Sequence, residues 1–100
     1  MTPDTDRTGR IRKLLERGLD PIEIEVIDES HLHAGHAGAR DGRGHFRVTV
    51  VSPRFVGRGR IERHRMVFEA LGTMMATDIH ALSVSALDPS ENRQNELTKA

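Results

Sequence analysis

The spacing of the apolar residues in this 100-residue chain constrains its fold most, because it switches between helical and strand periodicity. Residues 10–17 place apolar side chains three or four positions apart, which predicts a helix that ends at Gly18. Residues 22–26 and 45–51 alternate apolar and polar side chains, which predicts two strands. Residues 60–76 return to helical spacing, and residues 79–87 alternate again. The predicted order is helix, strand, strand, helix, strand.

The second helix and the last strand carry most of the expected core. The helix is expected to bury one face, made of His64, Val67, Phe68, Leu71, Met74 and Met75. The strand is expected to turn Leu82, Val84 and Ala86 to one side. His80 has the same parity as these three, so the pattern predicts a partly buried histidine at the start of the strand.

This order of elements predicts an α+β fold. A strand–helix–strand connection is right-handed and makes its two strands parallel, whereas a hairpin makes them antiparallel. The economical arrangement is a sandwich in which two helices cover one face of a three-stranded mixed sheet. A chain of this length builds one domain around one core.

Composition excludes several classes of protein. The chain has no cysteine, so it has no disulfide, no thiol nucleophile and no thiolate metal site of its own. No apolar run approaches the length of a membrane span, and the first seven residues lack the apolar stretch of a secretory signal. We therefore expect a small cytoplasmic protein that does not bind membranes.

Motifs for catalysis are missing as well. The sequence contains no Ser/His/Asp arrangement and no glycine-rich phosphate loop before a helix, so no catalytic residue is assigned and no enzyme is expected. Gly35-His-Ala-Gly38 matches the GxxG of KH domains by letter. It falls in a predicted hairpin loop rather than between two helices, so we interpret it as a chance match.

Histidines are the only candidate metal ligands. The segment from Ser30 to Gly44 is rich in glycine, predicts a long mobile hairpin loop, and contains His31, His33 and His36. From the residues alone, a solvated polar loop is the favoured interpretation and a metal site the alternative. His64 is most simply a hydrogen-bonded core residue, and His45 carries no signal of its own.

Charge is balanced overall but unevenly distributed. Residues 40–65 hold eight arginines against Asp41 and Glu62, whereas residues 20–29 hold five acids. Four of the arginines crowd the start of the second helix: Arg58, Arg60, Arg63 and Arg65. Cations beside the free N–H groups of a helix start favour an anion such as phosphate on nucleic acid or a carboxylate on a partner. A solvated basic face is the equally weighted alternative.

Several segments together resemble the BolA family. In chain order they are Val26-Ile-Asp-Glu-Ser30, His33, His45-Phe-Arg-Val-Thr-Val-Val-Ser52, Phe55-Val-Gly57, Arg63-His-Arg-Met-Val67 and His80-Ala-Leu-Ser83. The resemblance covers about residues 6–88, so it implies one BolA-like domain over residues 1–100 with a flexible N-terminus and C-terminal tail. It also implies a class II KH-like α-β-β-α-β fold that lacks the GxxG loop.

The resemblance implies a partner and a cofactor. BolA-like proteins pair with monothiol glutaredoxins and share a two-iron, two-sulfur cluster in iron–sulfur trafficking and iron regulation. By position, His80 matches the family's C-terminal ligand and His33 the ligand in the hairpin loop. The loop is longer than usual here, and His31 and His36 flank His33 as alternatives. Glutaredoxin and glutathione would supply the sulfur ligands, so no cofactor is expected on the isolated chain.

The resemblance also implies a rival function. Bacterial BolA-like proteins bind DNA as transcriptional regulators of morphology and stress response. Arg58, Arg60, Arg63 and Arg65 would then contact the phosphates of duplex DNA, or the same arginines would dock glutaredoxin or the carboxylates of glutathione. The chain alone is expected to be a monomer or weak homodimer. A third option is that its basic and acidic patches pair two copies head to tail.

Overall fold

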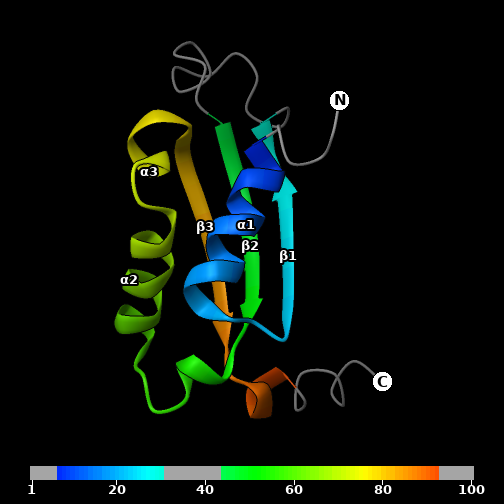
Figure 1. The fold of residues 1–100 in the computed structure, drawn as a ribbon, viewed down its shortest axis with the longest axis vertical. Helices are drawn as coiled ribbons and strands as arrows, with labels where there is room; N and C mark the ends of the chain where they lie inside the picture. The colour runs from blue at the N-terminus through cyan, green and yellow to red at the C-terminus, as the bar shows by residue number, and fades with distance from the viewer. Residues whose placement is uncertain (1–6, 31–43, 93–100) are drawn as a thin grey trace.

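The computed structural model describes residues 7–30 and 44–92. Its elements are α1 (Arg7–Leu19), β1 (Glu23–Asp28), β2 (Gly44–Val51), η4 (Pro53–Phe55), α2 (Arg60–Leu71), α3 (Met74–Thr77) and β3 (Ile79–Leu87). The strands form one sheet in the order β1-β2-β3, with β1 antiparallel and β3 parallel to β2 (Figure 1). The predicted α+β order and the three-stranded mixed sheet are confirmed.

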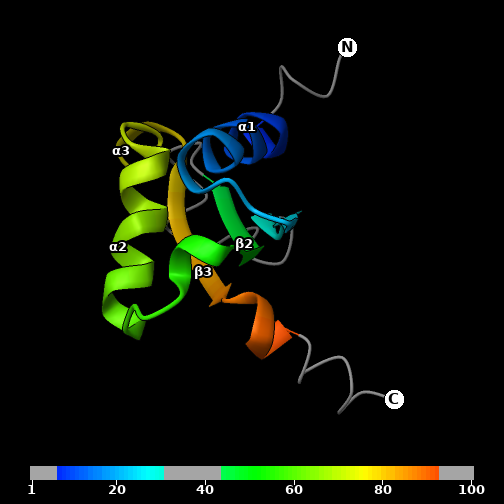
Figure 2. The ribbon, with the colours of Figure 1, turned by 60° about the horizontal axis from the view of Figure 1, so that its bottom comes forward.

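Both long helices cover the same face of the sheet (Figures 1 and 2). α1 packs against β1 and α2, whereas α2 packs against α1 and β3. The two helices approach closely at Gly18, where a Cβ atom would lie 2.8 Å from the Cβ of Ala70. Only glycine leaves room for the helices to meet there.

The core lies between the helices and the sheet and is almost entirely aliphatic. β2 contributes the buried residues Phe46, Val48 and Val50, as its alternation predicts. The two long helices and the remaining elements add Ile11, Leu15, Leu19, Phe55, Val67, Leu71, Met74 and Ile79. On β3, Leu82, Val84 and Ala86 pack against this core while Ala81, Ser83 and Ser85 are exposed, which confirms the predicted parity of that part of the strand.

Ser52 ties three elements together at the end of β2. It is the buried polar residue of the described core, and its Oγ donates to the main-chain oxygen of Leu19 at 2.6 Å. Its main-chain N–H donates to the oxygen of Leu87 at 3.0 Å. The ends of α1, β2 and β3 are therefore joined at one point.

The second helix is shorter than its apolar spacing predicts. Residues 60–76 were expected to form one helix, but α2 ends at Leu71 and Gly72 follows with a φ of 56°. The N–H of Gly72 donates to the oxygen of Phe68 at 3.0 Å, which closes the last turn. Because a left-handed residue cannot continue a helix, Met74–Thr77 form a separate short helix, α3.

Two residues expected on the buried face of α2 lie at its edge instead. Phe68 is 38% exposed, and His64 is half-buried with its ring edge-on to Phe68 at 6.4 Å between centroids. α1 and β3 bury the side of the helix that carries Val67 and Leu71. The predicted apolar face of the helix contains more residues than α1 and β3 cover. The prediction that Phe68 is buried was therefore wrong.

Residues 88–92, which follow β3, form a capped turn. The sequence predicts a frayed helix or disorder from Asp88, and residues 89–92 form a helical turn. Asp88 Oδ1 accepts from the N–H of Glu91 at 2.9 Å, and Glu91 Oε1 accepts from the N–H of Asp88 at 2.8 Å. This reciprocal pair is a capping box, with Pro89 at the first helical position.

Candidate functional site

Two histidines lie side by side at one end of the sheet. His45 is the second residue of β2 and His80 the second residue of β3. Because these strands are parallel and neighbours, their starts lie at the same end, and the two ring centroids are 5.2 Å apart at an interplanar angle of 48°. The structure therefore brings together one residue that the sequence singled out, His80, and one that it did not.

A β-bulge decides where His80 points. Gly44 pairs with Ile79 but His45 pairs with Ala81, so His80 is an extra residue on β3. Ile79 is buried, whereas His80 and Ala81 are both exposed. The prediction of a partly buried His80 was wrong because the bulge shifts the parity of the strand by one residue. Its imidazole is accessible to a partner or a metal.

Hydrogen bonds hold the starts of β2 and β3 in place next to this pair. The N–H of Gly44 donates to the oxygen of Asp78 at 2.9 Å, and the N–H of His45 donates to Ser30 Oγ at 3.1 Å. The N–H of Glu29 donates to the oxygen of His45 at 2.8 Å. Ser30 and Gly44, on either side of the segment that lies outside the described residues, are thus held next to the histidine pair.

The three loop histidines belong to that segment. His31, His33 and His36 lie outside the described residues, so their predicted role as ligands stays a prediction. In residues 7–30 and 44–92, no group of three or more His, Asp or Glu side chains is arranged to hold a metal ion. Within that part of the chain, His45 and His80 form a pair of imidazoles rather than a complete metal site.

The arginines at the start of α2 separate into two kinds. Arg58, Arg60 and Arg65 are exposed. Arg58 forms an ion pair with Glu62 at 3.1 Å, while Arg60 and Arg65 make no ion pair with any described residue. Arg60 and Arg65 are therefore available to an external anion, whereas Arg58 shares its charge with Glu62.

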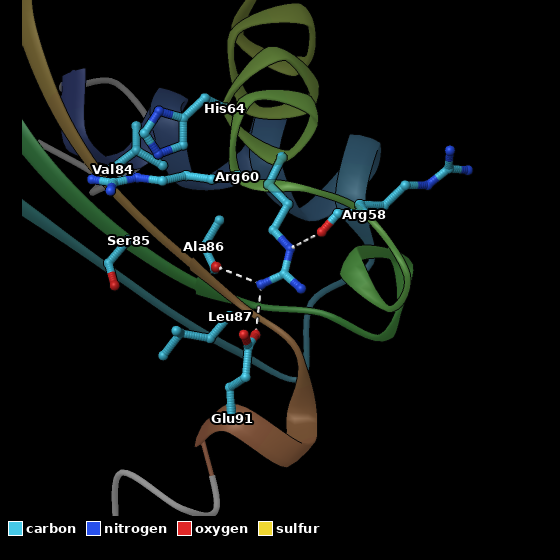
Figure 3. Close-up of a pocket in the computed structure, with 9 residues that line it drawn as sticks. Arg58, Arg60, His64, Val84, Ser85, Ala86, Leu87 and Glu91 are labelled. Atoms are coloured by element: carbon cyan, nitrogen blue, oxygen red, sulfur yellow. Dashed lines mark hydrogen bonds and ion pairs between the residues drawn. The ribbon is translucent and has the colours of Figure 1, made fainter.

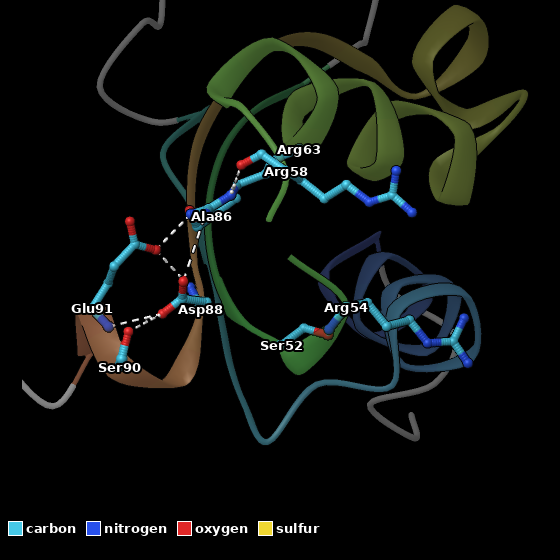
Figure 4. Close-up of polar contacts among 8 residues, drawn as sticks. All are labelled: Ser52, Arg54, Arg58, Arg63, Ala86, Asp88, Ser90 and Glu91. Atoms are coloured by element: carbon cyan, nitrogen blue, oxygen red, sulfur yellow. Dashed lines mark hydrogen bonds and ion pairs between the residues drawn. The ribbon is translucent and has the colours of Figure 1, made fainter. Parts of the chain in front are cut away.

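Arg63 is different, because its side chain is only 12% exposed and bonded within the fold. Its Nε donates to the oxygen of Arg58 at 2.9 Å, and its Nη1 donates to the oxygen of Ala86 at 3.1 Å and to Glu91 (Figure 4). The guanidinium also lies 5.9 Å from the centre of the Phe55 ring. Arg63 therefore joins α2 to the end of β3 and to the turn that follows.

The acids that receive Arg63 are stabilised in their charged form. Hydrogen bonds from the N–H of Asp88 and from Arg63 lower the pKa of Glu91 below its usual value. The pKa of Asp88 is also lowered, first by the Ser90 hydroxyl, which donates to its Oδ1 at 2.7 Å, and then by the N–H of Glu91. This cluster is a structural joint at the C-terminal end of β3.

A groove of about 390 Å³ lies beside this joint, between the start of α2 and the last residues of β3. Arg58, Arg60 and His64 line it from the helix side, and Val84 and Ser85 line it from β3. Figure 3 shows the Arg60 side chain extending across the strand toward Val84. The groove therefore combines arginine side chains on its helix side with residues of β3 on its other side.

Sequence reasoning missed His45 and the capping box. A parallel pairing of residues 45–51 with 79–87 places the two strand starts together, and this topology was a signal for the His45–His80 pair. The order Asp88-Pro-Ser-Glu91 is itself a capping-box signature.

None of the helices in the described residues has the length and apolar character that a membrane span requires.

Comparison with known proteins agrees with the fold and the motifs. A family model described as BolA-like protein matches residues 15–91. SufE-like protein 1, chloroplastic/mitochondrial, of Arabidopsis thaliana is 44% identical over 90 residues, which cover 85% of this chain and 24% of that protein. BolA-like protein 1 of Mus musculus is 45% identical over 85 residues, which cover 85% of this chain and 60% of that protein.

Solved structures show the same likeness. The BolA domain of SufE1 from Arabidopsis thaliana matches with a TM-score of 0.76 and 42% identity, over 86% of this chain and 95% of that one. The solution structure of BolA1 from Mus musculus matches with a TM-score of 0.74 and 43% identity, over 89% and 70% of the two chains. The chain spans between 24% and 60% of the length of the two relatives named above. Family model, sequence identity and fold agree, and this chain belongs to the BolA family.

Proposed function

We propose that this chain is a non-catalytic adaptor that binds a monothiol glutaredoxin and shares a two-iron, two-sulfur cluster with it. The observation that carries the proposal is the exposed His80 imidazole, turned out of the sheet by a bulge and set 5.2 Å from the ring of His45. Neutral imidazole is a common metal ligand, and an exposed one is accessible to a metal centre that a second protein holds.

The partner is needed because this chain lacks the usual ligands. Iron–sulfur clusters are normally held by cysteine thiolates, and the chain has no cysteine. In this proposal the glutaredoxin and glutathione supply the thiolates and His80 supplies an imidazole. A bound cluster of this kind supplies electron-transfer or cluster-transfer chemistry, and imidazole ligation raises its reduction potential.

His33 is the proposed second ligand from this chain. It follows Ser30 by three residues, and Ser30 is hydrogen-bonded to His45 beside His80. An extended chain advances about 3.3–3.6 Å per residue, so three residues span up to about 10 Å. That reach includes the histidine pair. His31 and His36 are the alternatives in the same segment.

The test is anaerobic reconstitution with a monothiol glutaredoxin, iron, sulfide and glutathione, followed by visible absorption and circular dichroism. We expect a heterodimer spectrum that differs from that of the glutaredoxin homodimer. His80→Ala should abolish the difference while the far-ultraviolet spectrum of the apo protein stays unchanged. His64→Ala is the matched control, because His64 lies on α2 in the groove and should leave the spectrum as it is. A spectrum unaffected by His80→Ala would rule out this ligand.

The second candidate function is DNA binding through the basic start of α2. Arg58, Arg60 and Arg65 are exposed, and three phosphate contacts would give a slope of about −2.7 in log K against log salt. Reversing Arg60 and Arg65 together should weaken binding to a duplex, whereas reversing the exposed Arg12 and Arg17 on α1 together is the control for the same change in net charge. Arg63 is left out of this test because its removal would disturb the fold.

A further inference from the structure

The outer side of β3 is an open edge of the sheet. In the strand order β1-β2-β3, no described strand pairs with β3 on the side away from β2. The oxygen of Leu87 accepts from Ser52 next to β2, so Leu87 directs its main-chain groups inward. Main-chain groups alternate along a strand, so Ala86, Val84 and Leu82 direct theirs outward. The oxygen of Ala86 already accepts a hydrogen bond from Arg63. The main-chain groups of Val84 and Leu82 remain available to pair with another strand.

This edge lacks the features that usually prevent strand pairing. The nine residues Ile79–Leu87 include no Lys, Arg, Asp, Glu or Pro. Proteins commonly protect open edges with such residues because an unprotected edge is a template for another strand. The opposite edge strand of the same sheet, β1, carries Glu23, Glu25 and Asp28. The two edges therefore differ, and only the β3 edge is suited to accept a strand.

The surface next to the β3 edge is basic and apolar. The groove of about 390 Å³ runs beside the strand, with Arg58 and Arg60 at its helix side (Figure 3). Phe68 on α2, whose ring lies edge-on to that of the groove residue His64, is 38% exposed. An occupant that matches this surface needs a free strand backbone, carboxylates and apolar side chains.

We propose that the β3 edge and its groove bind an extended acidic segment of a partner protein, which adds to the sheet as a fourth strand. Main-chain hydrogen bonds to Leu82 and Val84 hold the segment, and a carboxylate pairs with Arg60. This mode of recognition takes affinity from the backbone and specificity from alternate side chains.

A second copy of this chain fits the surface less well. Antiparallel pairing of two β3 edges in one sheet places the two α2 helices side by side, each with exposed Arg58, Arg60 and Arg65. Pairing of β3 with β1 of a second copy brings the acids of β1 to the groove, but it also places α2 beside α1, whose exposed residues include Arg10, Arg12 and Arg17. In both arrangements the like charges of the two facing helices oppose pairing. Nucleic acid has no peptide backbone to pair with Val84, so it would use the arginines alone.

This site goes beyond the glutaredoxin proposal. His80 lies at the start of β3, whereas the groove lies along Val84 to Leu87 at its end. An acidic segment that pairs with Leu82 and Val84 and continues along the groove toward Leu87 leads away from the histidine pair. The chain would then hold two partners at the two ends of one strand.

The test uses a blocked peptide of four Val-Glu repeats and the full chain labelled with ¹⁵N. We expect amide shifts at Leu82 and Val84 on titration, and slowed hydrogen exchange at Val84. Arg60→Glu should weaken binding about tenfold, because it replaces an attraction with a repulsion. Arg65→Glu is the matched control on the same helix, away from the groove, and should weaken binding less than about twofold.

A peptide of the same sequence that is N-methylated at every residue tests the backbone contacts without altering the protein. Its binding should be lost, because neither of its edges can donate main-chain hydrogen bonds. Equal binding of this peptide, equal losses from Arg60→Glu and Arg65→Glu, or shifts confined to β1 would each overturn the proposal. Dimerisation through β3 in the absence of peptide, or a duplex DNA that displaces the peptide while N-methylation has no effect, would assign the groove to those occupants instead.

Discussion

Arg63 of α2 donates from its guanidinium to the main-chain oxygen of Ala86 in β3 at 3.1 Å, from a side chain that is only 12% exposed. The same nitrogen donates to Glu91, so one side chain connects a helix, a strand end and a capped turn. An arginine at the start of a helix is unfavourable for the helix dipole. Here these contacts offset that cost, which explains its position.

Replacement of this arginine should destabilise the fold. Arg63→Met keeps most of the side-chain volume but removes the Arg63 donor from the oxygen of Ala86 and the cationic partner of Glu91, which keeps only its bond from the N–H of Asp88. We expect the free energy of unfolding to fall by about 2–3 kcal/mol, measured by urea denaturation. The control Arg65→Met, at an exposed position, should change it by less than about 0.5 kcal/mol. Equal effects would show that Arg63 is only a surface charge.

Acid should weaken the fold in part through Asp78. A hydrogen bond from Thr77 Oγ1 at 2.6 Å holds the pKa of Asp78 below its ordinary value of 3.8, with Arg10 and Arg7 adding to the effect and burial opposing it. A carboxyl with a lower pKa in the folded state stabilises the protein above its unfolded pKa. That stability is lost as the pH falls through the folded pKa, so stability should decline below about pH 4.

Asp78→Asn should make this acid decline shallower, because the group that takes up the proton is gone. Urea midpoints measured across the acid range give the slope, and a carboxyl-carbon NMR titration gives the pKa directly. Thr77→Val should raise that pKa toward the ordinary value. If Asp78 titrates at or above 3.8 in the unmodified protein, the assignment of its partners is wrong.

Gly44 is expected to tolerate no side chain at the start of β2. A Cβ atom there would lie 2.6 Å from Ser30 Oγ and 2.7 Å from the ring of Phe46, which is buried in the core. Gly44→Ala should therefore cost about 1–3 kcal/mol of unfolding free energy. Gly59→Ser is the matched control, because nothing lies within 4 Å of its Cβ position and it caps α2 without a side chain. It should leave stability unchanged or raise it by up to about 1 kcal/mol.

Two phenylalanines should differ sharply in their contribution to stability. Phe55 is fully buried, so Phe55→Ala should cost about 3–5 kcal/mol. Phe68 is 38% exposed, so Phe68→Ala should cost about 1 kcal/mol. Thermal and urea unfolding of both variants test this, and similar losses would place Phe68 in the core after all.

The sequence by itself determined the elements and their order. Periodicity is a local property that records which side of an element is buried, so the alternation of residues 45–51 predicted the buried Phe46, Val48 and Val50. The strand–helix–strand rule then predicted that β2 and β3 are parallel, as they are. Local periodicity predicted α2 less well. The helix ends at Leu71 because of Gly72, and Phe68 lies outside the face of α2 that α1 and β3 cover.

Only the tertiary structure decided the features on which the candidate site depends. The bulge that turns His80 outward arises from the register between strands that are distant in sequence, and the same pairing sets His45 beside it. Arg63 and Arg65 have the same side chain and stand two positions apart, yet one is bonded inside the fold and the other is exposed. Residue type alone does not distinguish the two, and the contact of Arg63 with Ala86, made across 23 residues of sequence, holds it inside the fold.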